Sequence, residues 1–176
     1  MITVGSLSRT IVVGLSLAIL AAGSRRNGGQ PDVHGFTPDD YSIYALVVAD
    51  AAARLDSGFV VTGLKRNTDW RGYFPNALHR VPVQYEVALQ AFLAIDTVKV
   101  DWTGLKSQGF RVVDREIANA GQHVVLGPIG YDSGRHKAIV YCSTFRGNLG
   151  AEGHLVLMSV RAGRWEITDS IGIWTS

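Results

Sequence analysis

The sequence Lys137-Ala-Ile-Val-Tyr-Cys-Ser-Thr-Phe145 reads as a β-strand. Successive side chains of a strand point to opposite sides, so Ala138, Val140, Cys142 and Thr144 share one face. The residues between them share the other face, and both faces are at least partly apolar. We expect one face to be covered by the two long helices predicted earlier in the chain.

Strand-like segments lie on either side of this one. They comprise residues 124–129, 155–161 and 164–174. The separators are Asp132-Ser133-Gly134, a glycine-containing segment from Arg146 to Gly153, and Ala162-Gly163. Ala162-Gly163 indicates a tight hairpin, because glycine tolerates the positive φ that short hairpin turns require. Four consecutive strands predict an antiparallel meander.

Two helices are predicted before the meander. Thr37-Pro38-Asp39-Asp40 is typical of a helix start, since threonine caps, proline suits the first turn and aspartates favour the positive end of the helix dipole. This helix should run to about Asp56, with Gly58 providing a left-handed end. Its apolar residues at helical spacing are Tyr41, Tyr44, Ala45, Val48, Ala52 and Leu55, while Ile43 and Val47 are apolar on the other side.

A second helix should begin at about Pro82, because Tyr85, Ala88, Leu89 and Phe92 recur at helical spacing. Shorter segments are predicted as a first strand (58–62), a further strand (98–102) and one or two helical turns (114–120). The chain is therefore predicted to be α+β. Two main N-terminal helices pack on a C-terminal antiparallel β-meander of about four strands.

The N-terminal residues 1–23 have the pattern of a signal peptide. Arg9 precedes the apolar run Ile11–Ala22, which is too short for a typical membrane-spanning helix and closes on small residues. Cleavage predicts a secreted or periplasmic protein with no stable transmembrane segment. The alternative is an uncleaved segment that tethers the chain to the inner membrane.

Residues 24–36 are polar and rich in glycine, which predicts a flexible leader, and residues 37–176 are predicted to form one globular domain. The hydrophobic share of 47% and the charged share of 18% are typical of a folded protein. With a net charge of +2 and scattered Lys and Arg, the sequence has no dense basic stripe of the kind that binds nucleic acid. The only cysteine, Cys142, excludes an internal disulfide.

Cys142 is a candidate nucleophile, with His123, His136 and His154 available as bases. Its position in the middle of a strand favours a packed, inert thiol instead. The five histidines lack the spacing of a zinc site, and no cofactor motif is present. We therefore predict neither a metal nor a cofactor.

The segment Arg146–His154 is the best candidate for the rim of a ligand site. Its glycines expose backbone amides beside charged side chains, which suits an anionic or polar ligand. The predicted ligand-binding residues are Arg146, Gly147, Gly150, Glu152, Gly153 and His154. Because it joins two strands, the segment lacks the helix dipole of a phosphate loop, and a plain hairpin loop is the alternative.

A second candidate site surrounds His79, because a histidine can serve as an acid or base near neutral pH. Asp69, Trp70, Arg71 and Tyr73 lie nearby in sequence, as does Arg80. The alternative is a solvated loop whose aromatic residues seal the edge of the domain.

A resemblance covers about the last fifty residues and implies a helix-then-sheet domain with a strand meander, but no activity. The segments that carry it are Gly127-Pro-Ile-Gly-Tyr-Asp132, Lys137–Tyr141, Gly147–Met158, Gly163-Arg-Trp-Glu-Ile167 and Ile173-Trp174. They resemble a pattern that recurs in uncharacterised exported bacterial proteins. The order of helices before a curved antiparallel sheet is also similar to the NTF2-like (cystatin-like) architecture.

Together these patterns favour a small exported binding or interaction domain, whose partner is a small ligand or an envelope protein. The alternative is a hydrolase acting on an envelope component, with His79 or His154 as base and Glu152 or Asp69 as its carboxylate partner. A structural envelope component is a third hypothesis and would require an exposed apolar patch.

Overall fold

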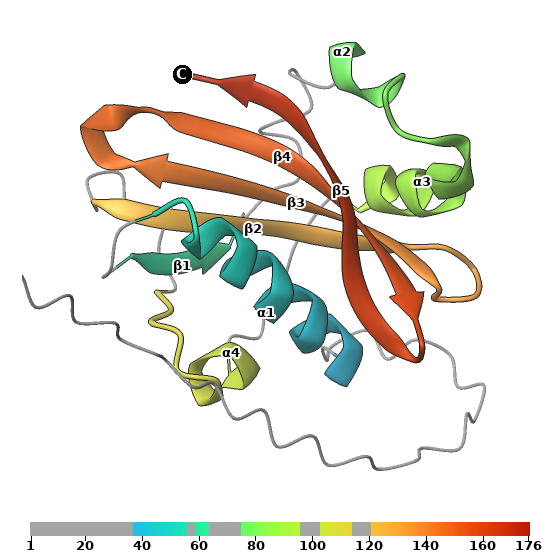
Figure 1. The fold of residues 1–176 in the computed structure, drawn as a ribbon, viewed down its shortest axis with the longest axis horizontal. Helices are drawn as coiled ribbons and strands as arrows, with labels where there is room; N and C mark the ends of the chain where they lie inside the picture. The colour runs from blue at the N-terminus through green and yellow to red at the C-terminus, as the bar shows by residue number, and fades with distance from the viewer. Residues whose placement is uncertain (1–36, 56–58, 64–74, 96–102, 114–120) are drawn as a thin grey trace, which may run out of the picture. The chain divides into compact units, whose positions relative to one another are not determined.

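A five-stranded sheet organises the part of the chain that the computed structural model describes, residues 37–55, 59–63, 75–95, 103–113 and 121–176 (Figure 1). The predicted signal peptide, leader, strand at 98–102 and helical turns at 114–120 lie outside these residues, as does Gly58. The strands are β1 (Val60–Gly63), β2 (Gln122–Tyr131), β3 (Lys137–Arg146), β4 (Ala151–Arg161) and β5 (Arg164–Thr175). They lie side by side in sequence order.

The predicted meander is present as β2 to β5, which are joined in antiparallel pairs. Ala162 and Gly163 form its tightest turn, with φ values of 48° and 76°, as a short hairpin requires. The fifth strand, β1, is the predicted first strand, and it pairs in parallel with β2.

Four α-helices accompany the sheet within the described residues. They are α1 (Pro38–Ala52), α2 (Pro75–Leu78), α3 (Glu86–Ala94) and α4 (Thr103–Ser107), and the 3₁₀ turn η2 (Val83–Tyr85) leads into α3. Thr37 caps α1 as predicted, and Asp40 completes a capping box by accepting from the Thr37 backbone. The short helix α4 has no counterpart in the prediction. None of the helices in the described ranges is long and apolar enough to cross a bilayer.

The two main helices pack on opposite faces of the sheet, not on one face as predicted. The face with Val140 and Cys142 belongs to the same core as the buried side of α1. The face with Ile139 and Tyr141 packs against α3. Since β3 is apolar on both sides, each face requires its own cover.

The buried side of α1 also differs from the predicted one. It consists of Asp40, Ile43, Tyr44, Val47, Val48 and Ala51. Ala45 and Ala52, which the pattern placed on the inner face, are only half-buried. Burying the larger Ile43 and Val47 removes more apolar area from water than burying alanine would, so these side chains face the core. The inner face predicted for the second helix is confirmed, with Tyr85 of η2 and with Ala88, Leu89 and Phe92 of α3 all buried.

Candidate functional site

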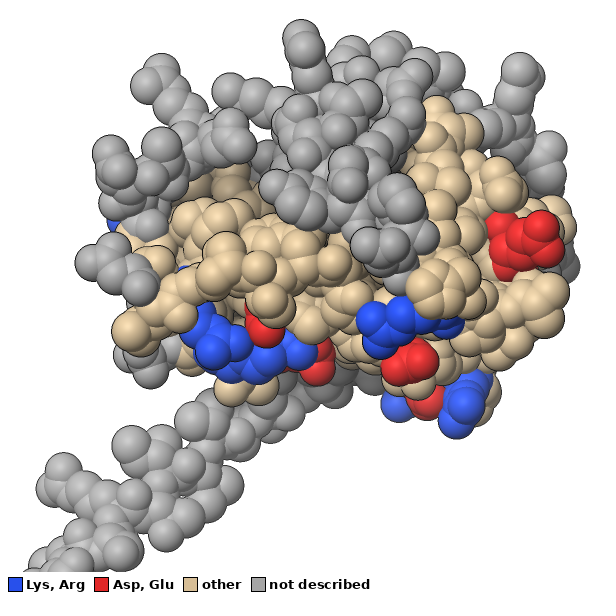
Figure 2. Space-filling view, turned by 90° about the horizontal axis from the view of Figure 1, so that it is seen from above, with Lys and Arg blue, Asp and Glu red and all other residues tan. Residues whose placement is uncertain are grey.

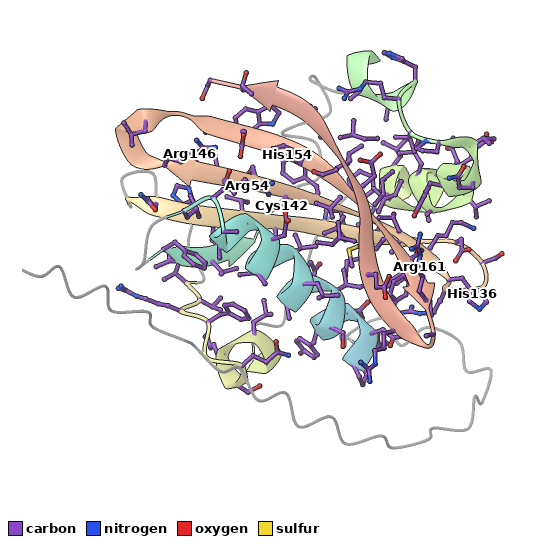
Figure 3. All side chains as sticks on the ribbon, viewed as in Figure 1. Arg54, His136, Cys142, Arg146, His154 and Arg161 are labelled. Atoms are coloured by element: carbon purple, nitrogen blue, oxygen red, sulfur yellow. The ribbon has the colours of Figure 1, made fainter. Side chains whose placement is uncertain are left out.

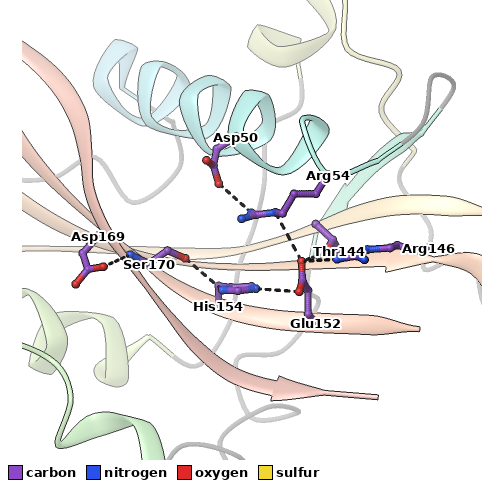
Figure 4. A network of polar contacts seen from close by, with 8 residues as sticks. All are labelled: Asp50, Arg54, Thr144, Arg146, Glu152, His154, Asp169 and Ser170. Carbon is purple, nitrogen blue, oxygen red and sulfur yellow. Dashed lines mark hydrogen bonds and ion pairs between the residues drawn. The ribbon is translucent and has the colours of Figure 1, made fainter. Parts of the chain in front are cut away.

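A polar cluster lies where the C-terminal end of α1 faces β3, β4 and β5 (Figure 3). We call it the Glu152 cluster, after the carboxylate at its centre. Its members are Asp50, Arg54, Thr144, Arg146, Glu152, His154 and Ser170 (Figure 4). They come from one helix with its following turn and from three strands.

Strand register brings the sheet members together. Glu152 pairs with Thr144 and His154 pairs with Cys142, so all four side chains lie on the face that α1 covers. Arg54 follows the last turn of α1, where its backbone nitrogen donates to the Ala51 carbonyl at 3.0 Å. The end of the helix thus directs an arginine towards the polar end of an otherwise apolar sheet face.

Glu152 receives most of its contacts on one oxygen. Arg146 Nη2 donates to Oε1 at 3.0 Å and Thr144 Oγ1 donates to the same atom at 3.2 Å. Arg54 Nε lies 3.6 Å from Oε1, and its Nη2 donates to Asp50 at 2.9 Å. The other oxygen, Oε2, lies 3.6 Å from His154 Nε2. Two arginines and a histidine therefore surround a single carboxylate.

These contacts lower the pKa of Glu152. Burial alone would raise that pKa, but the hydrogen bond from Arg146, the charge of His154 and the hydrogen bond from Thr144 outweigh it. Glu152 is therefore ionised at neutral pH.

Two nitrogen atoms of the cluster are buried and have no hydrogen-bond partner among the described residues: Arg54 Nε and His154 Nε2. Both point towards Glu152 at 3.6 Å, a distance that gives electrostatic attraction without a hydrogen bond. On the other side of its ring, His154 Nδ1 is hydrogen-bonded to Ser170 Oγ at 3.2 Å. Buried polar atoms are normally satisfied, so these two mark the cluster as unusual.

The structure brings together three of the predicted ligand-binding residues, Arg146, Glu152 and His154. Glu152, Gly153 and His154 lie in β4 and not in a loop, which corrects the predicted position of the strand. The hairpin is shorter than expected because the 3₁₀ turn η3 (Gly147–Leu149) reverses the chain at once.

The three predicted glycines support the hairpin and do not line the cluster. Gly147 and Gly150 have φ values of 64° and 108°, which disfavour other residues. At Gly153, a Cβ atom would clash with the Trp174 ring, so glycine permits this close packing.

His79 contributes no contact to the Glu152 cluster within the described ranges. It is exposed, just after α2. Its neighbour Arg80 donates from Nη1 to the Gly172 carbonyl at 3.1 Å, which ties this segment to β5. Asp69, Trp70, Arg71 and Tyr73 lie outside the described residues, so the predicted cleft around His79 stays a prediction.

Cys142 is a core residue, as predicted, with only 2% of its surface exposed. Burial raises the pKa of its thiol to about 12, although the charge of Arg54 opposes the shift. Besides His154, two histidines were suggested as bases for Cys142. His136 is exposed and precedes β3, at the end away from the Glu152 cluster, and His123 stacks on Phe145 with ring centroids 4.3 Å apart. Cys142 is not the nucleophile of this site.

Sequence reasoning missed Arg54, Asp50, Thr144 and Ser170 as site residues. Only the spacing of Glu152 and His154 indicated a shared face, since alternate residues of a strand point the same way. Nothing in the sequence placed the end of a distant helix opposite them.

Charges of both signs are interspersed on one face of the described residues. In the view of Figure 2, Lys and Arg side chains lie beside Asp and Glu side chains and form no broad basic area. Within the described ranges, no three His, Cys, Asp or Glu side chains are grouped so that they could hold a metal ion. No protein-family model, curated protein or solved structure matches this chain.

Proposed function

We propose that this chain is an exported binding protein that recognises a small anionic ligand at the Glu152 cluster. The observation that carries the proposal is the convergence of Arg54 and Arg146 on one carboxylate. The exported location belongs to the proposal and follows from the pattern of residues 1–23.

Both arginines retain unused donors. A guanidinium carries five N–H groups in a fixed fork, which suits bidentate binding of a carboxylate or phosphate. In the described part of the chain, Arg146 uses Nη2 on Glu152, and Arg54 uses Nη2 on Asp50. Their side chains are 40% and 31% exposed, so an anion can reach them from solvent.

A small ligand is favoured over a polyanion. Nucleic acid requires a run of basic side chains along its backbone, and the charges visible in Figure 2 alternate in sign. A compact anion needs only the two arginines, with His154 as a further donor when it is protonated.

The test is isothermal titration calorimetry of the protein with inorganic phosphate, acetate and citrate at low ionic strength. We expect at least one anion to bind, and Arg146→Gln to weaken binding about tenfold or more, because one charge-assisted contact contributes about 1.5–3 kcal/mol. The matched control is Arg161→Gln, which alters an exposed arginine at the end of β4 that is paired with Glu166 of β5 at 3.9 Å. Binding that is equal in both variants, or absent in the wild type, would contradict the proposal.

A hydrolase is the second candidate, and the His154–Glu152 contact is the observation that favours it. An ionised carboxylate 3.6 Å from an imidazole can fix its tautomer and support its action as a base. Hydrolysis of chromogenic esters that is lost in His154→Gln would support this function. Equal rates in the wild type and this variant would argue against it.

A further inference from the structure

We infer that Ser170 is the nucleophile of an acyl-transfer site, with His154 as its general base and carboxylic esters as substrates. The inference rests on the hydrolase candidate and goes beyond it by naming the attacking atom. Glu152 acts as the positioning residue behind His154.

The three side chains form a continuous line across β5 and β4 (Figure 4). Ser170 Oγ lies 3.2 Å from His154 Nδ1, and His154 Nε2 lies 3.6 Å from Glu152 Oε2. A nucleophile that contacts a base, which a third group orients, is the arrangement that activates a serine hydroxyl.

The charge of Glu152 selects the required tautomer. A carboxylate beside Nε2 favours the proton on that nitrogen, which leaves the lone pair of Nδ1 directed at the Ser170 hydroxyl. Arg146 and Thr144 hold the Glu152 side chain in place through hydrogen bonds of 3.0 and 3.2 Å. The base is thus oriented before a substrate arrives.

Ser170 is accessible to a substrate. It lies on β5, the outermost strand of the sheet on this side, and its side chain is half-buried. Its backbone nitrogen donates to Asp169 Oδ1 at 2.8 Å, which fixes the main chain at this point. Cys142 is also next to His154 in register, but its thiol is sealed in the core.

In the reaction, Ser170 Oγ attacks the ester carbonyl carbon while its proton passes to His154 Nδ1. The C–O bond to the alcohol then breaks, and the alcohol leaves with the proton from His154. Water next attacks the acyl-serine and gives a proton to His154. The bond between the acyl carbon and Ser170 Oγ then breaks, His154 returns the proton to Ser170 Oγ, and the carboxylic acid is released. No redox step or cofactor is required.

The test is covalent labelling of the full chain with diisopropyl fluorophosphate, followed by intact mass and peptide mapping. We expect a single adduct on Ser170, no adduct in Ser170→Ala, and labelling about 100-fold slower in His154→Gln. Glu152→Gln should slow labelling about tenfold and change its pH profile. Ser159→Ala, on the neighbouring strand, is the matched control and should label at the wild-type rate.

Three outcomes would overturn the inference: no adduct on the wild type, an adduct on another residue, or equal labelling rates with and without His154. Thermal unfolding of each variant verifies that it is folded. Ester hydrolysis that persists in Ser170→Ala would also overturn it, while leaving a hydrolase that activates water directly. Anion binding is measured separately with the Arg146 variant, so the failure of one proposal is distinguishable from the failure of the other.

Discussion

A carboxylate faces an arginine near each end of α1, Asp40 of the helix at one end and Glu152 of β4 at the other, but the two sites are built differently. At the N-terminal end, Asp40 accepts from the Thr37 backbone and hydroxyl on one oxygen and from the Tyr131 hydroxyl on the other. Arg135 lies 3.5 Å from Asp40, donates to the Thr37 hydroxyl at 3.1 Å and rests on the Tyr131 ring 3.8 Å from its centroid.

At the C-terminal end, the carboxylate of Glu152 is more exposed than that of Asp40, and some nitrogen atoms of its cationic neighbours make no hydrogen bond with the described residues. The side chain of Glu152 is 20% exposed, against 11% for Asp40. Arg54 Nε and His154 Nε2 have no hydrogen-bond partner in the described part of the chain. The carboxylate at the N-terminal end is fully engaged by hydrogen bonds that secure the helix, whereas two buried nitrogen atoms at the C-terminal end have no such partner among the described residues, which is why we propose the function there.

The largest loss of stability should result from a substitution at the N-terminal end of α1. Asp40→Ala removes the capping box and the acceptor of the Tyr131 hydroxyl, so we expect the free energy of unfolding to fall by about 3 kcal/mol. Urea denaturation measures this loss. Asp39→Ala, an exposed residue of the same helical turn, is the control and should change stability by less than about 0.5 kcal/mol. A loss below about 1 kcal/mol for Asp40→Ala would remove the contrast between the two ends.

A smaller effect is expected at the C-terminal end. Glu152→Gln keeps the shape of the side chain but removes its charge from partly exposed partners, and should reduce stability by about 1 kcal/mol. The same denaturation assay applies. Glu166→Gln, whose ion pair with Arg161 is longer and more exposed, should leave stability unchanged. If Glu152→Gln is as costly as Asp40→Ala, both ends are structural.

The pH dependence of stability tests whether Glu152 acts through its charge. The pKa of Glu152 in the folded protein lies below its ordinary value of 4.5, so its stabilising contribution is complete at neutral pH. That contribution is lost as the pH falls from about 5 through the lowered pKa. The stability difference between wild type and Glu152→Gln should therefore shrink from about 1 kcal/mol at pH 7 towards zero as the pH falls below that lowered pKa. A constant difference in acid denaturation would show that Glu152 acts through packing alone.

The smallest expected effect is the alkylation of Cys142, which lies beside the Glu152 cluster, in the folded protein. With a pKa of about 12, the thiolate fraction is about 10⁻⁵ at pH 7, and the side chain is buried. We expect no alkylation by iodoacetamide in the folded protein and complete alkylation in urea, as measured by mass spectrometry. Rapid labelling of the folded protein would indicate that the C-terminal end of α1 opens locally.

Local patterns predicted the elements well. The alternation along Lys137–Phe145, the turn at Ala162-Gly163 and the Thr37 cap each depend on residues close in sequence, and each is present. The placement of the two main helices on opposite faces depends on packing between segments that are far apart in the sequence. The apolar residues on both sides of β3 were the available signal, but a pattern cannot tell which helix covers which face.

The candidate site was predictable only in part, for the same reason. Arg146, Glu152 and His154 belong to one hairpin and were recognised together. Arg54 and Ser170 reach the cluster from α1 and β5, through packing and through a register shift between Gly153 and His154. A bulge changes which side chains meet, and its position is not encoded in hydrophobic periodicity.

The parallel pairing of β1 with β2 has a consequence for the folding kinetics. Val60 lies opposite His123, so the chain that contains α2, α3 and α4 forms a long loop which must close before this edge assembles. The three hairpins of the meander involve only neighbouring segments and carry a much smaller entropic cost. We expect the meander to nucleate and the β1 edge to be the last to join and the first to detach, a sequence that hydrogen exchange of the amides across β1 (Val60–Gly63) and β4 (Ala151–Arg161) would resolve.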